Sequence, residues 1–200
     1  MHFQPDEQYH IYNRGNNHQP IFFNDDNYLF FLKKIKTQIV PYCDLLCWCL
    51  MPNHFHLIIN ANEHSCKPRQ SFGNSYIQEL SYQIGILLST YTQAINKQKK
   101  TSGSLFQQKT KSKILDSKND SKKGDYLINA MHYTHQNPWK AALVKKMEDW
   151  PYSSFSDYAG FRNGQLCNKS LLMNLTGYDL GNFYTDSYGV IDGYSDRFLL

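Results

Sequence analysis

The sequence predicts an α+β fold: a ferredoxin-like split βαβ arrangement with helices packed on an antiparallel sheet, plus a C-terminal extension. Three observations support this prediction. Strand-like and helical segments alternate in the order βαββαβα, an apolar content of 41% suits a domain with a full core, and the sequence after residue 150 is rich in Gly, Asp and Tyr but short of Lys. We therefore expect one domain over residues 1–150 and an extension over residues 151–200 that packs on it.

The first half of the chain predicts a strand, a helix and two further strand-like runs. Residues 8–17 indicate a strand and a turn. A helix is expected over residues 24–40, because Asn24 can cap it, acidic residues occupy its first turn and apolar residues recur at helical spacing. Residues 43–60 form two strand-like runs around a turn-prone step at residues 51–53, which either joins neighbouring antiparallel strands or bends one strand.

The second half continues the alternation. A helix, a strand and a helix are expected in turn over residues 74–98, 104–115 and 125–136. The polar stretch over residues 116–124 indicates a loop. The last helix should end near Asn137, because Pro138 disfavours helical backbone in the residue before it. In this order of elements, the strand over residues 54–60 can lie at the centre of the sheet.

Composition excludes several classes of protein. The N-terminal residues lack the basic start and apolar run of a signal peptide, and no apolar run has membrane-spanning length. We therefore expect a cytoplasmic protein that does not contact a membrane. The five cysteines are odd in number and form no Cys-x-x-Cys pair, which argues against a disulfide framework or a structural zinc knuckle.

Positive charge is concentrated in one region. Between Lys97 and Lys123 there are nine lysines and two aspartates, a local charge of +7, which leaves −3 for the rest of a chain whose net charge is +4. Such a stretch favours a polyanionic partner such as nucleic acid, and the alternative is a solvated lysine-rich loop that binds nothing in particular. Lys109, Lys111 and Lys113 alternate, so on an extended strand their charges would share one face.

Two histidines stand one residue apart in an otherwise apolar strand. His54 and His56 would share one face of that strand, while Phe55 and Leu57 would share the other. Neighbouring imidazoles can bind one cation and leave its other positions open. We expect such ligands to be solvent-accessible and to add little to core packing. The alternative is a pair of half-buried histidines that are hydrogen-bonded to their neighbours.

A phenol and an amide share one face of the last predicted helix. Tyr133 and Asn137 are four residues apart, and the amide oxygen of Asn137 could reach a metal ion from the end of that helix. A phenol can attack phosphorus when a cation polarises the phosphate. His54, His56 and Asn137 would form a mixed nitrogen and oxygen site for a divalent ion. The alternative for Tyr133 is a core tyrosine with a hydrogen-bonded hydroxyl.

Five ordered blocks carry a resemblance to a known family: YHIYNRGNNHQPIF, CLMPNHFHLII, GSLFQQKTKSK, YLINAMHYTHQNPWKAALV and WPYSSFSDYAG. Over residues 9 to about 160, the chain resembles the HUH-type single-tyrosine transposases, most closely their REP-associated tyrosine transposase branch. The resemblance places His54 and His56 in the motif that names the superfamily, Tyr133 at the nucleophile and Asn137 at the position that completes the metal site. Arg14 falls in the early Asn-Arg-Gly block, where it can grip a phosphate or a base edge, or merely pin a turn.

Three departures from the family pattern avoid the inferred catalytic groups. Thr134 stands where isoleucine is frequent, Trp139 where valine is frequent, and residues 107–109 read Gln-Gln-Lys where a Gly-Arg pair is frequent. The last of these could weaken or redirect contacts with DNA.

The resemblance implies a metal-dependent single-stranded DNA endonuclease and strand transferase that acts beside DNA hairpins. It would need Mg²⁺ or Mn²⁺, use no nucleotide cofactor, form a 5′-phosphotyrosine through Tyr133 and contact phosphates through Arg14, Lys109, Lys111 and Lys113. Two other classes stay open: a non-catalytic DNA-binding protein on the same fold, and a metal-dependent nuclease that uses an activated water. The oligomeric state is open between a monomer and a homodimer.

Overall fold

The computed structural model describes residues 1–71, 73–115 and 123–189 of the 200-residue chain. Most of the loop predicted over residues 116–124, with Lys118 and Lys122 of the lysine-rich stretch, lies outside these described residues. In the described part of the chain, no helix has the length and the apolar character that crossing a membrane requires. All five cysteines lie in the described part and are free thiols.

Four antiparallel strands form the central sheet, in the order β2-β3-β1-β6. They are β1 (Gln8–Arg14), β2 (Cys43–Met51), β3 (His54–Ala61) and β6 (Lys111–Ile114). β3 lies between β1 and β2, and β1 lies between β3 and β6, which is the interleaving of a split βαβ fold. The α+β prediction and the central position of β3 are therefore confirmed.

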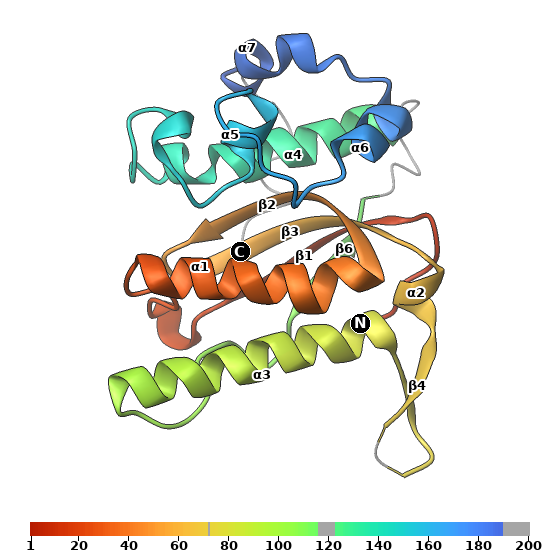
Figure 1. Ribbon diagram of the computed structural model, residues 1–200, viewed down its shortest axis with the longest axis vertical. Helices are drawn as coiled ribbons and strands as arrows, with labels where there is room; N and C mark the ends of the chain where they lie inside the picture. The colour runs from red at the N-terminus through yellow and green to blue at the C-terminus, as the bar shows by residue number, and fades with distance from the viewer. Residues whose placement is uncertain (72, 116–122, 190–200) are drawn as a thin grey trace.

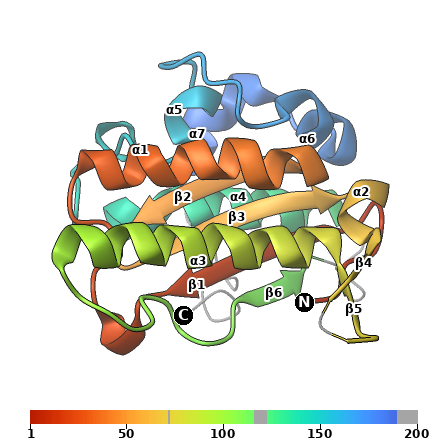
Figure 2. The same cartoon turned by 60° about the horizontal axis from the view of Figure 1, so that its bottom comes forward.

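Helices cover both faces of this sheet, so the molecule has three layers (Figure 1). The α-helices are α1 (Asp25–Lys34), α2 (Glu63–Cys66), α3 (Glu79–Lys99), α4 (Lys123–Lys140), α5 (Phe155–Tyr158), α6 (Lys169–Thr176) and α7 (Phe183–Ser187). α1 and α3 run side by side across one face, as Figure 2 shows. α4 covers the other face, and α5, α6 and α7 lie outside it (Figure 1).

Short helical turns complete the connections. α1 passes into a π-helical turn over Ile35–Ile39. The 3₁₀ turns are Asn16–His18, Val40–Tyr42, Met147–Asp149 and Leu180–Asn182. The side chain of Asn24 accepts a hydrogen bond from the backbone of Asn27, so the predicted N-cap of α1 is confirmed.

The face under α1 and α3 is a dry aromatic core. Phe55 of β3 lies 5.3 Å from Phe31 of α1 and 6.1 Å from Phe106, measured between ring centroids. Phe31 in turn meets Tyr91 of α3 edge-on at 4.9 Å. All four side chains are buried. These contacts pack one face of β3 against the helices α1 and α3. The alternate side chains of β3 lie on the opposite face of the sheet.

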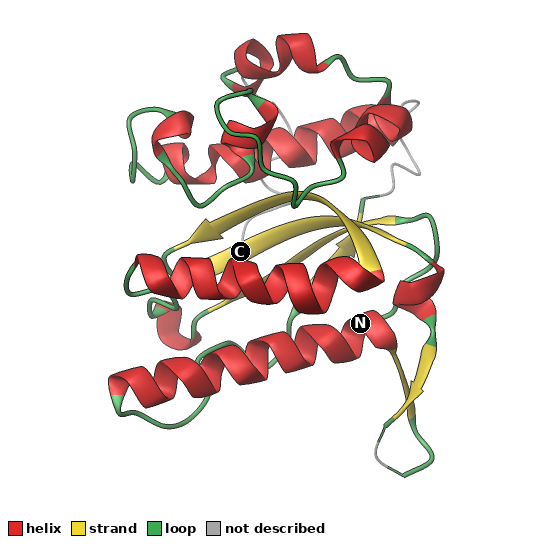
Figure 3. Ribbon diagram, in the orientation of Figure 1, coloured by secondary structure: helices red, strands yellow, loops and turns green. Residues whose placement is uncertain are grey.

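The second helix begins later than the sequence predicts. Residues 74–78 were expected to be helical, but α3 starts at Glu79 and Tyr76–Gln78 form β5, paired with β4 (Pro68–Gln70) in a small projecting hairpin (Figure 3). The side-chain amide of Gln78 donates to the carbonyl of Phe3 and accepts from its N–H, at 2.8 and 2.6 Å. These tertiary bonds hold the backbone of Gln78 extended, and this overrides the helical pattern of the sequence.

The last predicted helix does not end at Asn137. α4 runs to Lys140 with Pro138 inside it, so the predicted boundary is wrong. A proline in a helix leaves the carbonyl four residues earlier, here that of Thr134, without its backbone donor. The side-chain amide of Asn137 donates to that carbonyl at 3.2 Å and to the carbonyl of Tyr133 at 3.0 Å. The side chain before the proline thus replaces the missing donor, and the helix continues.

Residues 151–189 pack on α4 and β2. Ser154 lies 2.8 Å from Nε2 of His135 and accepts a hydrogen bond from the backbone of Trp48 at 3.0 Å. Nδ1 of His132 lies 2.9 Å from the hydroxyl of Ser187. His132 and His135, which flank Tyr133 in the sequence, therefore contact the extension. The domain boundary at residue 150 stays a prediction.

Candidate functional site

The face of the sheet under α4 collects polar side chains in two cross-strand rows. In the first row His54 of β3 lies opposite Arg14 of β1. In the second row His56 lies opposite Tyr12, which lies opposite Lys111 of β6. Paired residues of neighbouring strands point to the same face. The sheet therefore brings the predicted metal ligands beside two of the predicted DNA contacts.

The two predicted imidazole ligands lie edge to face. The ring centroids of His54 and His56 are 4.9 Å apart. Each ring has its Nδ1 engaged on the outer side: His54 with the amide oxygen of Asn53 at 2.6 Å, and His56 with Nε2 of His10 at 2.8 Å. Nε2 of His56 is buried and has no hydrogen-bond partner among the described residues. This orphaned nitrogen is the atom through which an imidazole with an engaged Nδ1 binds a metal.

Burial keeps these imidazoles neutral. Burial, with help from the charge of Arg14, lowers the pKa of His54 to about 4. The pKa of His56 lies well below its usual value, because burial and the neighbouring histidines disfavour a positive charge. Burial, with the charge of Lys113, lowers the pKa of His10 to about 3. At neutral pH the rings therefore carry the unprotonated nitrogen that metal binding requires.

The exposure of the two histidines differs from the prediction. His54 is half-buried, but His56 is only 1% exposed. The expectation that both are solvent-accessible ligands outside the core is therefore wrong for His56. The reason is its position on a central strand under α4, where every side chain of β3 after His54 is buried.

α4 places Tyr133 over this face. Its side chain is 7% exposed, and burial raises its pKa, with a further contribution from the nearby phenol of Tyr12. Nζ of Lys140 lies 5.6 Å from the centroid of the Tyr133 ring. The ring of Tyr12 also lies 6.2 Å from that of His56. Tyr12 therefore lies near both the expected nucleophile and one of the expected metal ligands.

Asn137 contacts its own helix rather than either histidine. Its amide nitrogen donates to two α4 carbonyls, and its Oδ1 accepts no hydrogen bond within the described residues. The described residues contain no cluster of three or more His, Cys, Asp or Glu side chains suited to a metal. Within the described residues, a third protein ligand beside the two histidines would come from another residue type, such as an amide or a phenol. An imidazole pair and the amide oxygen of Asn137 have the chemistry to bind a divalent cation, and the hydrogen bonds of Asn137 go to α4 carbonyls rather than to the histidines.

Three of the four predicted DNA contacts converge. Arg14, Lys109 and Lys111 line a small depression together with Tyr12, and Nζ of Lys111 lies 5.7 Å from the centroid of the Tyr12 ring. Lys113 lies two residue pairs further along β6, opposite His10. Because β6 begins at Lys111, Lys109 precedes the strand, and the expectation that all three lysines alternate along one strand is wrong for Lys109.

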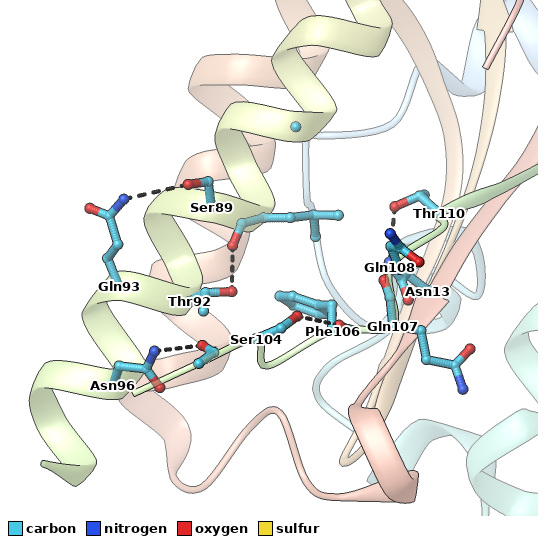
Figure 4. Close-up of a pocket in the computed structure, with 13 residues that line it drawn as sticks. Asn13, Ser89, Thr92, Gln93, Asn96, Ser104, Phe106, Gln107, Gln108 and Thr110 are labelled. Carbon is cyan, nitrogen blue, oxygen red and sulfur yellow. Dashed lines mark hydrogen bonds between the residues drawn. The ribbon is translucent and has the colours of Figure 1, made fainter. Parts of the chain in front are cut away.

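A second hollow lies on the other face of the sheet, between α3 and residues 103–110 (Figure 4). It is lined mainly by neutral polar side chains, among them Ser89, Thr92, Asn96 and Gln107. It holds no histidine, cysteine, acidic or basic residue. The predicted metal ligands and the predicted nucleophile therefore lie outside this hollow.

Sequence reasoning missed three residues of this face. From the sequence, none of His10, Tyr12 and Asn53 is assigned to the metal site or to DNA binding. The alternation of His10 and Tyr12 in the first strand predicts only that they share a face. Their position beside His56 follows from the register between β1 and β3, which a single sequence does not reveal.

The comparisons with known proteins agree with the resemblance seen in the sequence. With two histidines on the central strand and a tyrosine on the covering helix, the chain resembles the HUH-type single-tyrosine transposases. Within that class its similarity is to the REP-associated tyrosine transposases. A putative member from Haemophilus influenzae is 25% identical over 116 residues, which cover 54% of this chain and 56% of that protein. The chain thus spans about half the length of this curated relative.

A solved structure gives the same indication for the fold. A REP-associated tyrosine transposase bound to a REP hairpin superposes with a TM-score of 0.55 at 15% identity, over 84% of this chain and 92% of the other. At that identity the likeness concerns the fold alone. No protein-family model matches the chain.

Proposed function

We propose that this protein is a metal-dependent single-stranded DNA endonuclease and strand transferase that forms a 5′-phosphotyrosine intermediate next to DNA hairpins. One observation carries the proposal: the buried, partnerless Nε2 of His56 lies beside His54 on the sheet face that Tyr133 covers. Buried polar atoms are usually hydrogen-bonded, so this nitrogen is a candidate for contact with a bound cation. The name of the curated relative and the hairpin bound by the related structure support DNA as the partner.

His54, His56 and Asn137 would hold Mg²⁺ or Mn²⁺. The ion would supply Lewis acidity that stabilises charge on the scissile phosphate and on the departing oxygen. The protein's own contribution is the donor set: two neutral imidazoles, each with its Nδ1 held by a neighbour, and one amide oxygen. These few protein ligands leave room for a phosphate oxygen.

Tyr133 would act as the nucleophile. Its hydroxyl oxygen forms a bond to phosphorus, the bond to the 3′ oxygen breaks, and the strand leaves as a 3′-hydroxyl. Because burial raises the pKa of Tyr133, the phenol keeps its proton at neutral pH and must lose it as the new bond forms. The phosphodiester energy is retained in the phosphotyrosine, so a 3′-hydroxyl can attack it and rejoin or transfer the strand.

Arg14, Lys109, Lys111 and Lys113 would bind the DNA backbone. The first three line one depression beside Tyr12, and Lys113 extends the positive charge along β6 on the same face. A strand bound there would reach the histidines across the second cross-strand row. Bidentate contact through the guanidinium of Arg14 suits a phosphate or a guanine edge.

A labelled single-stranded hairpin tests the proposal. The protein is incubated with this DNA and Mn²⁺, and a denaturing gel should show a covalent adduct. Tyr133→Phe keeps the ring and removes the nucleophilic oxygen, so it should abolish the adduct while DNA affinity and melting temperature barely change. Tyr126→Phe, on the same helix, is the matched control and should keep the adduct. Mass spectrometry should find the DNA on the peptide that contains Tyr133.

The other outcomes identify the alternatives. Cleavage without an adduct would indicate a nuclease that uses an activated water, and retention without cleavage would indicate a non-catalytic DNA-binding protein. The burial of Tyr133, which is 7% exposed, favours this last alternative, since a nucleophile must reach its phosphate. An adduct on a tyrosine other than Tyr133 would overturn the catalytic assignment. The cytoplasmic location and the choice between monomer and homodimer stay predictions.

A further inference from the structure

Asn53 lies in the turn between β2 and β3 and contacts His54 from the outer side. Its Oδ1 is 2.6 Å from Nδ1 of His54, and its Nδ2 donates to the carbonyl of His18 at 3.3 Å. The carbonyl of Asn53 also accepts a hydrogen bond from the N–H of Gly15 at 2.8 Å. One residue therefore joins the proposed metal ligand to the loop that follows β1.

These bonds determine which nitrogen of His54 carries its proton. The amide NH₂ of Asn53 faces a carbonyl, which can only accept, so the amide oxygen must face His54. An oxygen acceptor requires an N–H opposite it, and Nδ1 of the neutral ring is therefore protonated. The lone pair is left on Nε2, the nitrogen available to a cation.

The loop that anchors Asn53 is itself held in a specific conformation. Asn17 and His18 both have left-handed backbone, with φ of 51° and 60°. A Cβ at Gly15 would lie 2.1 Å from the carbonyl oxygen of Gln19, so the loop requires glycine there. Unusual backbone of this kind is retained where the surroundings determine it. It holds the His18 carbonyl where Asn53 needs an acceptor.

The same loop carries a proposed DNA contact. The guanidinium of Arg14 contacts Nδ1 of His18 through Nη2. A continuous path thus runs from Arg14 through His18 and Asn53 to His54. A phosphate contact and a metal ligand are fixed by one turn of backbone, although they lie on different strands.

We propose that Asn53 is a positioning residue: it fixes the tautomer and the ring orientation of His54 and ties both to the loop of Arg14. This inference rests on the proposed function, because the role of Asn53 would be to prepare His54 for binding a divalent cation. Asn53 takes no part in the chemistry itself.

Two substitutions separate the roles of the amide. Asn53→Ala removes both hydrogen bonds, whereas Asn53→Asp keeps an oxygen acceptor for His54 and loses the donor to His18. Asn62→Ala is the matched control, because Asn62 follows β3 at its far end and caps α2 instead. Circular dichroism and melting temperature establish that each variant folds.

Nitrogen-15 NMR of the histidine rings in the metal-free protein reads the tautomer directly. His54 should carry its proton on Nδ1 in the wild type, in Asn53→Asp and in Asn62→Ala, and should become a mixture of tautomers in Asn53→Ala. Mn²⁺ affinity, measured by electron paramagnetic resonance, should fall about 10- to 100-fold in Asn53→Ala and stay within a few-fold in the other two. A proton on Nε2 in the wild type, or an unchanged tautomer in Asn53→Ala, would overturn the inference.

This experiment distinguishes two failures. If the wild type binds no Mn²⁺ and forms no adduct, the proposed function is wrong, yet the tautomer of His54 still decides the role of Asn53. If Asn53→Ala does not fold, the His54 tautomer in the wild type and in Asn53→Asp still tests the inference. A proton on Nδ1 in both proteins supports it, and a proton on Nε2 overturns it.

Discussion

The two faces of the sheet are built by the same strands and have opposite character. On β3, Phe55 packs into the aromatic core under α1 and α3, while His54 and His56 lie on the opposite face of the sheet, the one that α4 covers. The aromatic face is packed by rings, and the hydroxyl of Tyr91 there donates a hydrogen bond to the carbonyl of Ile21. The other face buries imidazoles, and Nε2 of His56 has no hydrogen-bond partner among the described residues. Burying such a group costs free energy. Alternate residues of one strand can thus serve different ends: Phe55 stabilises the core, while His54 and His56 supply the polar groups of the candidate site.

The largest effect on stability should come from the aromatic face. Phe55→Ala removes a ring that touches Phe31 and Phe106 and is 1% exposed. We expect the free energy of unfolding to fall by about 3–5 kcal/mol, measured by urea denaturation. Mn²⁺ affinity of the folded protein should not change. A loss below about 1 kcal/mol would mean that this face does not carry the stability of the sheet.

A smaller loss of stability should follow from the polar face. His56→Ala leaves His10 buried without the imidazole that it contacts, so unfolding should become easier by about 1–3 kcal/mol. His54→Ala, at a half-buried position, should cost less. Both variants should lose Mn²⁺ binding and strand cleavage. Urea denaturation and a Mn²⁺ titration of each variant check this, and retained binding in either would remove that histidine from the metal site.

Acid should weaken the α4 side of the molecule. Burial, partly opposed by Asp186, lowers the pKa of His132 from 6.5 to about 4. Between about pH 6.5 and 4, His132 is therefore protonated in the unfolded chain but neutral in the folded protein. This histidine's contribution is present above pH 6.5 and is lost as the pH falls towards 4, at about 1.4 kcal/mol per pH unit.

The variant His132→Leu provides the test of this pH dependence. The free energy of unfolding should depend less steeply on pH between 6.5 and 4 than in the wild type. Urea denaturation across that range measures the slope. Equal slopes in the two proteins would show that His132 is not held neutral by the fold.

The smallest effect should come from single lysines. Lys111 lies on the polar face beside Tyr12, whereas Lys97 lies on α3 across the sheet. For single-stranded DNA, the log–log slope of affinity against salt should flatten by about 0.7 for each lost phosphate contact. Lys111→Ala should show this change and Lys97→Ala should not. Fluorescence anisotropy in a salt series measures both, and the reverse pattern would place the DNA on the α3 side.

Local sequence signals predicted the elements that local forces determine. The Asn24 cap, the turn at residues 51–53 and the alternation of His54 with Phe55 all act within a few residues, and the structure has each of them. Together with the resemblance in five blocks, these signals were enough for the α+β fold and for the pairing of the two histidines.

Long-range contacts account for the rest. The late start of α3 depends on a bond between Gln78 and Phe3, which are 75 residues apart. The partnership of His10 with His56 depends on strand register over 46 residues. Neither separation leaves a mark in a single sequence. The end of α4 was mispredicted for a different reason: a side chain supplied the hydrogen bond that the rule for proline assumes to be missing.

The side chain of Asn137 has two roles, one in the structure of α4 and one in the proposed metal site. Its nitrogen closes the gap that Pro138 opens in α4, and its oxygen is the candidate ligand. Replacing Asn137 with aspartate, a stronger ligand for hard cations, would take away the donor and leave the Thr134 carbonyl unsatisfied beside Tyr133. A redesign of metal preference at residue 137 therefore also has to restore a donor to the Thr134 carbonyl, for example by replacing Pro138 with a residue that has a backbone N–H.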